Sequence, residues 1–349
     1  PIPLTPYDRR TIQLDAPSPL PSASIVAWVP KPSLPAGPTY ACSLSGDPGL
    51  IESLKPLVTH GPDQVWIDPG GDTVERTHQA LILIQRAMDA TPRPHVTLVT
   101  QNAWSGDPGA AAIWGLARCA ALELPDLKIR CVDIENETDL PTVAQILASG
   151  EDEQGWRVQE GNASVARLKA WTPPQARFHP RPGTWLITGG RGALGSHVTR
   201  FLVEQGATHI RLTGRSPATS SDEARWDELR SQGTHIEYLQ TDVTNEREVD
   251  TLFATEAPVV GIIHAAGVLD DRSVLHLNRD HLARSFSAKV QGATNLVEAV
   301  EARSLSLQAL VWFSSLAGVC GSPGQGNYAA ANAFLDAFSA TLRDRGLPS

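Results

Sequence analysis

Three polar residues near the C-terminal end of the sequence have the types and spacing of a proton-transfer site. Ser315 follows the apolar run Ala309–Phe313, which predicts a strand, and Tyr328 and Asn332 lie four residues apart in the helical pattern that follows. A separation of four places the two side chains on one face of a helix. A serine hydroxyl that hydrogen-bonds a carbonyl oxygen, beside a tyrosine that donates a proton to it, could serve the reduction of a ketone by hydride transfer. The alternative is that Tyr328 only packs and that Asn332 has no part in catalysis.

A glycine-rich loop lies between the apolar segment Trp185–Ile187 and an apolar helical pattern. Glycines at such a junction let the backbone approach a pyrophosphate, which the N-terminus of the helix then faces. The strand and helix on either side make this a dinucleotide-binding pattern, although a glycine-rich turn without a ligand would share it. The residues that we predict to hold a cofactor here are Thr188, Gly189, Gly190, Gly192, Leu194 and Gly195.

The end of the next predicted strand indicates which dinucleotide would bind. A cofactor with a free ribose 2′-hydroxyl usually meets an acidic residue at this point, but the sequence has Arg215 and Ser216. A guanidinium beside a hydroxyl suits a 2′-phosphate, which favours NADPH, although Arg215 would equally suit a solvated surface. After the following strand, Asp242 and Val243 are placed to contact the adenine base; for Asp242 a simple turn is the alternative.

These residues belong to two successive halves in which strand and helix patterns alternate. In the first half, strands are expected at Ser24–Val29, Gln64–Ile67, Pro94–Thr100 and Leu127–Ile134, helices at 74–89 and 109–124, and a closing pair of strands near 157–168. The second half repeats the alternation and includes one long helix over about 278–301. Such alternation predicts an α/β protein with doubly wound parallel sheets. Because Val29 runs into prolines, which lack backbone N–H groups, we expect the first half to have this fold without a phosphate-binding loop.

Prolines mark the predicted boundaries. Ten of the 27 prolines fall in residues 1–38, so we expect a linker or irregular segment over 1–23. Prolines recur near 172–183, which divides a structural subdomain at 24–172 from a cofactor-binding, catalytic subdomain at 183–349. The only methionine is Met88, and from the missing start methionine we expect a piece of a longer polypeptide.

Composition argues against several classes of partner. A formal net charge of −9 gives no basic face for nucleic acid. No apolar run is long enough to cross a membrane, and the N-terminus has no signal-peptide pattern. The four cysteines form no C-x-x-C pair, so no metal site is expected. We therefore expect a cytoplasmic protein that binds neither nucleic acid nor membrane.

The sequence resembles the short-chain dehydrogenase/reductase superfamily and, within it, the ketoreductase domains of modular (type I) polyketide synthases. The superfamily pairs its serine and tyrosine with a lysine four residues after the tyrosine, where this sequence has Asn332. In the ketoreductase domains lysine and asparagine exchange places, and Lys289 lies on the preceding helix pattern. The resemblance covers roughly residues 24–349, and its most similar runs are Ser322–Phe334, Trp114–Arg118 with Ala121–Glu123, and His264–Asp271.

The resemblance implies two Rossmann-like subdomains and roles for further residues. Lys289 would lower the pKa of Tyr328, and Asn332 would hold Lys289 or a water in place. Ala265, Ala266 and Gly267 would line the cofactor site. The implied reaction is the NADPH-dependent reduction of a β-ketoacyl thioester, carried on the phosphopantetheine arm of an acyl carrier protein, among neighbouring polyketide synthase domains.

The resemblance also implies a stereochemical class. Leu269, Asp270 and Asp271 are similar to the signature of B-type ketoreductases. A-type domains have tryptophan eight residues before the tyrosine, where this sequence has Cys320, and proline two residues after the tyrosine would suggest the epimerising subtype, where this sequence has Ala330. A D-configured (3R) product without α-epimerisation is therefore implied.

Two alternatives remain open at this point. One is a non-catalytic, ketoreductase-like scaffold domain of a megasynthase, and the other is a different short-chain dehydrogenase/reductase, such as a sugar-nucleotide epimerase. In the resembled family a strand, a lid segment and a final strand follow the helix that bears the tyrosine. We therefore expect that the chain, which ends at Ser349, is truncated at its C-terminus.

Overall fold

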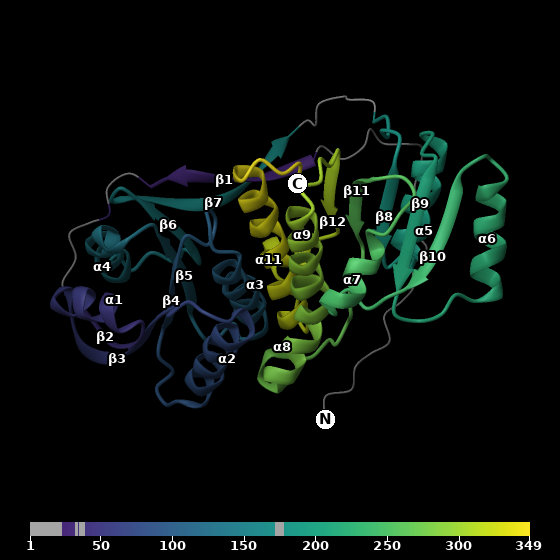
Figure 1. The fold of residues 1–349 in the computed structure, drawn as a ribbon. Coiled ribbons are helices and arrows are strands. Elements are labelled where there is room, and N and C mark those ends of the chain that lie inside the picture. The colour runs from purple at the N-terminus through teal and green to yellow at the C-terminus, as the bar shows by residue number, and fades with distance from the viewer. Residues whose placement is uncertain (1–22, 32–33, 35–38, 172–177) are drawn as a thin grey trace, which may run out of the picture.

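Each half of the chain builds its own β-sheet, and a layer of helices lies between the two sheets (Figure 1). The computed structural model describes residues 23–31, 34, 39–171 and 178–349. The predicted linker over residues 1–23 lies outside the described residues except for Ala23, and residues 172–177 of the predicted boundary lie outside them too. No helix in the described ranges has the length and apolar character needed to cross a membrane.

The N-terminal sheet has the strand order β1-β7-β6-β5-β4-β3-β2. Strands β2 to β6 run parallel, whereas β7 pairs antiparallel with both β6 and β1. The strands are β1 (Ala23–Pro30), β2 (Tyr40–Gly46), β3 (Val58–Ile67), β4 (Val96–Gln101), β5 (Ile129–Ile134), β6 (Gly155–Gln159) and β7 (Asn162–Trp171). The helices are α1 (Pro48–Leu54), α2 (Thr73–Asp89), α3 (Pro108–Glu123) and α4 (Leu140–Ala148).

The strand expected at Ser24–Val29 forms as β1, but it is not the first strand of the parallel set. It lies at the sheet edge and pairs only with β7, so the first parallel strand is β2, whose half-polar sequence gave no strand pattern. The turn after β2 ends in Asp47, whose carboxylate accepts a hydrogen bond from the Leu50 N–H at 2.8 Å and caps α1. An acidic cap occupies the helix N-terminus where a phosphate would sit in a nucleotide-binding fold.

The carboxyl edge of the N-terminal sheet is filled by the chain's own charges. Arg76 on α2 is only 3% exposed and donates hydrogen bonds to Asp68 (3.1 Å) and to Asp107 (2.7 Å). Asp107 also caps α3 through the N–H groups of Gly109 and Ala110. This buried ion cluster fixes the starts of α2 and α3 relative to the sheet, since a buried guanidinium needs its counter-charges.

The C-terminal sheet is fully parallel, with the order β10-β9-β8-β11-β12. The order reverses between β8 and β11, and open α/β sheets bind ligands at the carboxyl ends of the strands beside such a reversal. The strands are β8 (Thr184–Thr188), β9 (His209–Gly214), β10 (His235–Gln240), β11 (Val259–His264) and β12 (Ala309–Trp312). The helices are α5 (Ala193–Glu204), α6 (Ser220–Arg230), α7 (Glu246–Leu252), α8 (Arg279–Phe286), α9 (Gly292–Ala302), α10 (Leu316–Cys320) and α11 (Gly326–Asp344).

The long helix expected over about 278–301 is interrupted. A π-helical segment, Ser287–Gln291, separates α8 from α9 and contains Lys289. A π segment inserts an extra residue into the helical repeat, often at a functional site, and an apolar periodicity of 3.6 residues does not reveal it. The insertion rotates Lys289 relative to the helix that precedes it.

The two subdomains share one hydrophobic core, which is centred on the contact between α3 and α11. Both helices have buried small residues, Ala110–Ala112 and Gly115 on α3 and Ala329–Ala331 on α11, and Gly115 lies against the backbone of Ala329 and Ala330. A Cβ on Gly115 would lie 2.4 Å from the Ala329 carbonyl oxygen, so the two helices approach as closely as a glycine permits. Figure 1 shows α3 and α11 side by side between the two sheets. The N-terminal subdomain thus packs directly on the helix that carries Tyr328.

We expect Gly115→Ala to lower the free energy of unfolding by about 1–3 kcal/mol, because the added methyl overpacks the contact between α3 and α11. Alanine otherwise favours a helix interior by roughly 0.5–1 kcal/mol over glycine, so a net loss reports the clash. Gly106→Ala is the control, because a Cβ there meets no atom closer than 4.0 Å. Urea unfolding of both variants measures the effect, and a Gly115→Ala midpoint equal to that of the parent would contradict this packing.

Candidate active site

The glycine-rich loop after β8 is shaped by contacts that exclude side chains. Gly189 has φ +67°, and a Cβ on it would lie 2.8 Å from the Ala265 carbonyl oxygen. A Cβ on Gly195 would lie 2.4 Å from the Gly189 carbonyl oxygen. Helix α5 begins after Gly192 without a side-chain cap, so its first N–H groups face the loop unshielded. A backbone cradle at an uncapped helix N-terminus fits a pyrophosphate.

A cleft of about 270 Å³ opens at this loop. Nine of the predicted cofactor residues line it, namely Gly189, Gly192, Arg215, Ser216, Asp242, Val243, Ala265, Ala266 and Gly267. Thr188, Gly190 and Gly195 lie behind the lining, while the Leu194 side chain is exposed. Asp242 accepts hydrogen bonds from the Thr244 N–H (3.0 Å) and hydroxyl (2.9 Å), so it serves the turn whether or not it contacts a base.

Seven cleft residues were not predicted from the sequence, namely Arg191, Thr213, Gly214, Tyr238, Thr241, Thr244 and Ala288. The hydroxyls of Thr213 and Thr241 are buried without a hydrogen-bond partner in the described chain, as expected of polar groups that await a ligand. Arg191 is held by Asp222 at 2.7 Å. Arg191 interrupts the glycine run, and a basic residue inside such a loop is the signal that could have identified it.

Lys289 and Tyr328 meet beyond the carboxyl end of β12, and Ser315 lies two residues after Phe313, whose carbonyl binds Lys289. Lys289 is 5% exposed, and its ammonium donates to the Phe313 carbonyl oxygen at 2.7 Å and lies 5.4 Å from the centre of the Tyr328 ring. Burial lowers the pKa of Lys289 to about 8. Ser315 caps α10, where its hydroxyl accepts from the Ala317 N–H at 3.2 Å. The site therefore brings a positive charge beside a phenol, with a serine hydroxyl on the neighbouring helix cap.

Asn332 is fully buried one turn after Tyr328. Its amide donates to the Tyr328 carbonyl oxygen at 2.8 Å, and its side-chain oxygen has no hydrogen-bond partner among the described residues. Lys289 is thus held by the Phe313 carbonyl and not directly by Asn332. The free oxygen of Asn332 could accept from a water, which was the other expected arrangement.

His264 ties the cofactor loop to the π segment. Its Nε2 lies 2.9 Å from the Ala288 carbonyl oxygen, which can only accept, so Nδ1 accepts from the Thr188 hydroxyl at 2.8 Å. Burial lowers the pKa of His264 to about 4, so the ring is neutral near pH 7. The sequence identified this histidine only as part of a run, and its contacts to β8 and to the residue before Lys289 come from the tertiary fold.

The predicted stereocontrol residues lie on the loop after β11. Leu269 is 67% exposed, Asp270 pairs with Arg284 (2.7 Å), and Asp271 accepts from the Gln325 amide at 2.8 Å. Asn327 donates to the Asp270 carbonyl oxygen at 2.8 Å. The loop therefore lies against the residues that immediately precede Tyr328.

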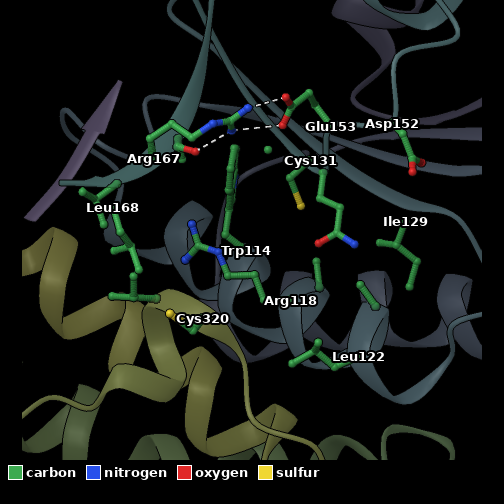
Figure 2. Close-up of a pocket in the computed structure, with 17 residues that line it drawn as sticks. Trp114, Arg118, Leu122, Ile129, Cys131, Asp152, Glu153, Arg167, Leu168 and Cys320 are labelled. Carbon is green, nitrogen blue, oxygen red and sulfur yellow. Dashed lines mark hydrogen bonds and ion pairs between the residues drawn. The ribbon is translucent and has the colours of Figure 1, made fainter. Parts of the chain in front are cut away.

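A larger cavity, of about 400 Å³, lies apart from these residues, between α3, α10 and the strands of the N-terminal sheet. Figure 2 shows Arg118 beside Trp114 inside it and the Glu153–Arg167 ion pair near by. The Arg118 guanidinium lies 5.4 Å and 5.5 Å from the ring centres of Trp104 and Trp114 and donates to the Gly318 carbonyl oxygen at 2.6 Å. None of the predicted site residues lines this cavity.

Two family models match successive parts of the chain. Residues 183–349 match the KR domain, and residues 26–168 match the Rossmann fold domain of polyketide synthase extender module SpnB. The chain is 37% identical over 274 residues to polyketide synthase GfsA of Streptomyces halstedii, which covers 72% of this chain and 4% of that protein. It is 34% identical over 298 residues to erythronolide synthase EryA3 of Saccharopolyspora erythraea, which covers 80% of this chain and 9% of that protein.

A solved structure of A-type ketoreductases from a modular polyketide synthase superposes with a TM-score of 0.82 at 26% identity, over 94% of this chain and 81% of that one. The chain belongs to the ketoreductase domains of modular polyketide synthases. It spans only 4% and 9% of the length of the two curated relatives.

That family has two Rossmann-like subdomains with different roles, which accounts for the difference between the two halves of this ketoreductase. Two Rossmann-like subdomains are present, as expected, and only the C-terminal one has a glycine-rich loop after its first strand. Domains of this kind bind NAD(P)H. Three features of this chain fit a dinucleotide: the uncapped N-terminus of α5, the glycines at which a Cβ would clash, and the two threonine hydroxyls without a partner in the described chain. No group of three or more His, Cys, Asp or Glu side chains in the described chain is arranged to hold a metal ion.

Proposed function

We propose that this ketoreductase domain uses NADPH to reduce the β-ketone of an acyl thioester, carried on the phosphopantetheine arm of an acyl carrier protein, within polyketide biosynthesis. The observation that carries the proposal is the contact between Lys289 and Tyr328, with Ser315 two residues after the Phe313 carbonyl that binds the ammonium, in the subdomain that has the dinucleotide cleft. A buried ammonium beside a phenol serves proton transfer, because its positive charge stabilises the negative charge that the phenol acquires when it gives up its proton.

The residues of this chain divide the work of ketone reduction. NADPH, when bound, supplies hydride to the carbonyl carbon. Tyr328 donates the proton that the ketone oxygen needs, and Ser315 donates a hydrogen bond to that oxygen as its negative charge develops. Lys289 stabilises the phenolate that Tyr328 becomes after it donates its proton. The buried Asn332 supplies an acceptor for a water that returns a proton to Tyr328.

Cofactor choice rests on Arg215 and Ser216 at the end of β9. Arg215 is exposed at the cleft and has no carboxylate within 4.0 Å in the described part of the chain, so its charge is available to a 2′-phosphate. An acidic residue, which would favour a free 2′-hydroxyl, is absent from this position.

We expect Arg215→Ala to raise the Kd for NADPH by roughly 10- to 100-fold, because a hydrogen bond to a charged group contributes about 1.5–3 kcal/mol. The Kd for NADH, which lacks the 2′-phosphate, should change less than twofold. Arg247→Ala, on an exposed face of α7, is the matched control. Fluorescence titration with both cofactors gives the two constants, and equal losses for NADPH and NADH would refute the assignment.

The product is proposed to be the D (3R) alcohol of a B-type reductase, without α-epimerisation. The support is the loop of Leu269, Asp270 and Asp271, which binds the residues just before Tyr328, together with Cys320 and Ala330 at the two type-marking positions. A similar solved structure is A-type, but at 26% identity its type is not transferred to this chain. Partners proposed with this function are an acyl carrier protein and neighbouring synthase domains.

A spectrophotometric assay of NADPH oxidation with a β-ketoacyl thioester tests the proposal, followed by chiral analysis of the alcohol. The expected result is the oxidation of one NADPH for each ketone reduced, with a 3R alcohol as the product. Oxidation only with a sugar nucleotide would favour another short-chain enzyme. Failure to bind NADPH in a folded, full-length protein would favour the scaffold alternative.

A further inference from the structure

We propose that Glu123 is a positioning residue that joins the two loops beside Tyr328 and thereby fixes the stereochemistry of reduction. The first loop is residues 269–274, after β11, and the second is residues 322–327, before Tyr328. Glu123 is the last residue of α3 and belongs to the subdomain that lacks the cofactor cleft. The inference rests on the proposed function, because it concerns how that site presents a ketone.

The carboxylate of Glu123 binds both loops at once. One oxygen accepts from the Gly324 N–H at 2.8 Å, and the other accepts from the Val274 N–H at 2.7 Å. Both are charge-assisted hydrogen bonds to backbone groups, which are among the stronger kinds in proteins. Two segments that are distant in the sequence are therefore held by a single side chain.

The loops also bind each other next to this carboxylate. Arg272 and Gln325 form an isolated parallel bridge, and the Gln325 amide donates to Asp271 at 2.8 Å. Asn327 donates to the Asp270 carbonyl oxygen at 2.8 Å and to the Ser285 hydroxyl at 2.7 Å. Release of Glu123 would loosen the segment that carries Asp270 and Asp271 relative to the residue before Tyr328.

Among the described residues, other side chains of the N-terminal subdomain form hydrogen bonds to only one of these two loops or to a neighbouring segment. The backbone N–H and carbonyl of Ser322 both contact the Cys119 sulfur at 3.1 Å, and the Gln85 amide donates to the carbonyls of Val274 and Leu277. Arg118 donates to Gly318 on α10. Glu123 differs from them because it contacts both loops, so we expect its loss to uncouple them.

The position of Glu123 in its helix supports a specific role. The C-terminus of a helix carries partial negative charge, which disfavours an acidic residue there. An acid at the last residue of α3 therefore works against the local electrostatics, and its two backbone hydrogen bonds to other segments supply the compensation.

The experiment compares Glu123→Ala and Glu123→Gln with the parent in the natural, full-length protein. Glu52→Gln is the matched control, because its side chain is 73% exposed on α1. Hydrogen exchange over residues 269–274 and 322–327 reports the loops, chiral analysis reports the alcohol, and titration reports NADPH binding. We expect Glu123→Ala to lose protection in both loops together, to lower kcat/KM at least tenfold and to erode the product ratio. The Kd for NADPH should stay within twofold.

Glu123→Gln should have a smaller effect in the same direction, because its one remaining side-chain oxygen can accept from only one loop. If Glu123→Ala does not fold, this variant decides the matter. Unchanged exchange in both loops with an unchanged product ratio would overturn the inference. A parent that shows no reductase activity would refute the proposed function instead, while the exchange data would still show whether Glu123 couples the loops.

Discussion

Replacing Tyr328 by phenylalanine should lower kcat for thioester reduction by roughly 10²- to 10⁴-fold, the range that a positioned general acid contributes. The phenol would be the group that gives the ketone oxygen its proton, and the substitution removes only that hydroxyl. Within the described residues the Tyr328 hydroxyl makes no hydrogen bond, and Tyr328 does not line the cofactor cleft. The variant should therefore fold normally and bind NADPH with an unchanged Kd.

Tyr40→Phe provides the matched control for this substitution. Tyr40 lies in the N-terminal subdomain, where its hydroxyl donates to Asp63 at 2.6 Å, far from the cofactor loop in the sequence and in the fold. Its loss should leave kcat unchanged even if stability falls. Steady-state kinetics on both variants decide the matter, and a Tyr328→Phe enzyme that keeps more than a tenth of the parental kcat would rule out the proton-donor role.

Replacing Lys289 by methionine should lower kcat by about 10²- to 10³-fold, the cost of removing one group that stabilises charge developing in the transition state. The ammonium lies 5.4 Å from the centre of the Tyr328 ring and is fixed by the Phe313 carbonyl. Methionine preserves the length of the side chain and removes the charge. Lys55→Met, at a side chain that is 68% exposed, should have no effect on kcat.

Deprotonation of Lys289 should change activity and stability in opposite directions as the pH rises. Burial lowers the pKa of Lys289 from 10.5 to about 8, so the folded protein releases this proton at lower pH than the unfolded chain does. The charged form therefore costs stability below about pH 8, and the cost disappears as pH rises from about 8 to 10.5. Activity, which needs the ammonium, should fall over the same range.

Two measurements on the parent and on Lys289→Met test whether activity falls while stability rises. Rate against pH should fall through about pH 8 in the parent only. Urea unfolding should show a gain of stability above that pH in the parent, and Lys289→Met should lack this gain. Identical pH profiles for the two proteins would contradict a titrating Lys289.

The sequence patterns located most elements of the C-terminal subdomain. The apolar segment Trp185–Ile187 lies within β8, and the predicted strand Ala309–Phe313 forms as β12 (Ala309–Trp312). Strand β2 was missed because only one of its residues is fully buried. The π segment and the five-residue helix α10 depend on packing against α11 and α3, which no local pattern records.

Some parts of the candidate site could be predicted from local sequence patterns, and others could not. The glycine loop follows from local strand and helix context, and two of its six predicted residues, Gly189 and Gly192, line the cleft. Lys289 could not be linked to Tyr328 by spacing, because the contact between them forms across two helices, and the prediction depended on a family resemblance. The links through His264 and Glu123 are tertiary hydrogen bonds to backbone groups, whose partners the sequence does not specify.

The most direct test of the proposed reductase activity follows the transfer of hydride from NADPH to the β-carbon of the thioester. The full-length protein is given a β-ketoacyl thioester and NADPH that carries deuterium at the transferable position of the nicotinamide, and the alcohol is examined by mass spectrometry. We expect one deuterium on the β-carbon of a 3R alcohol, and no such product from Tyr328→Phe within the same time. A folded protein that binds NADPH yet transfers no deuterium to any β-ketoacyl thioester, with or without its carrier protein, would contradict it.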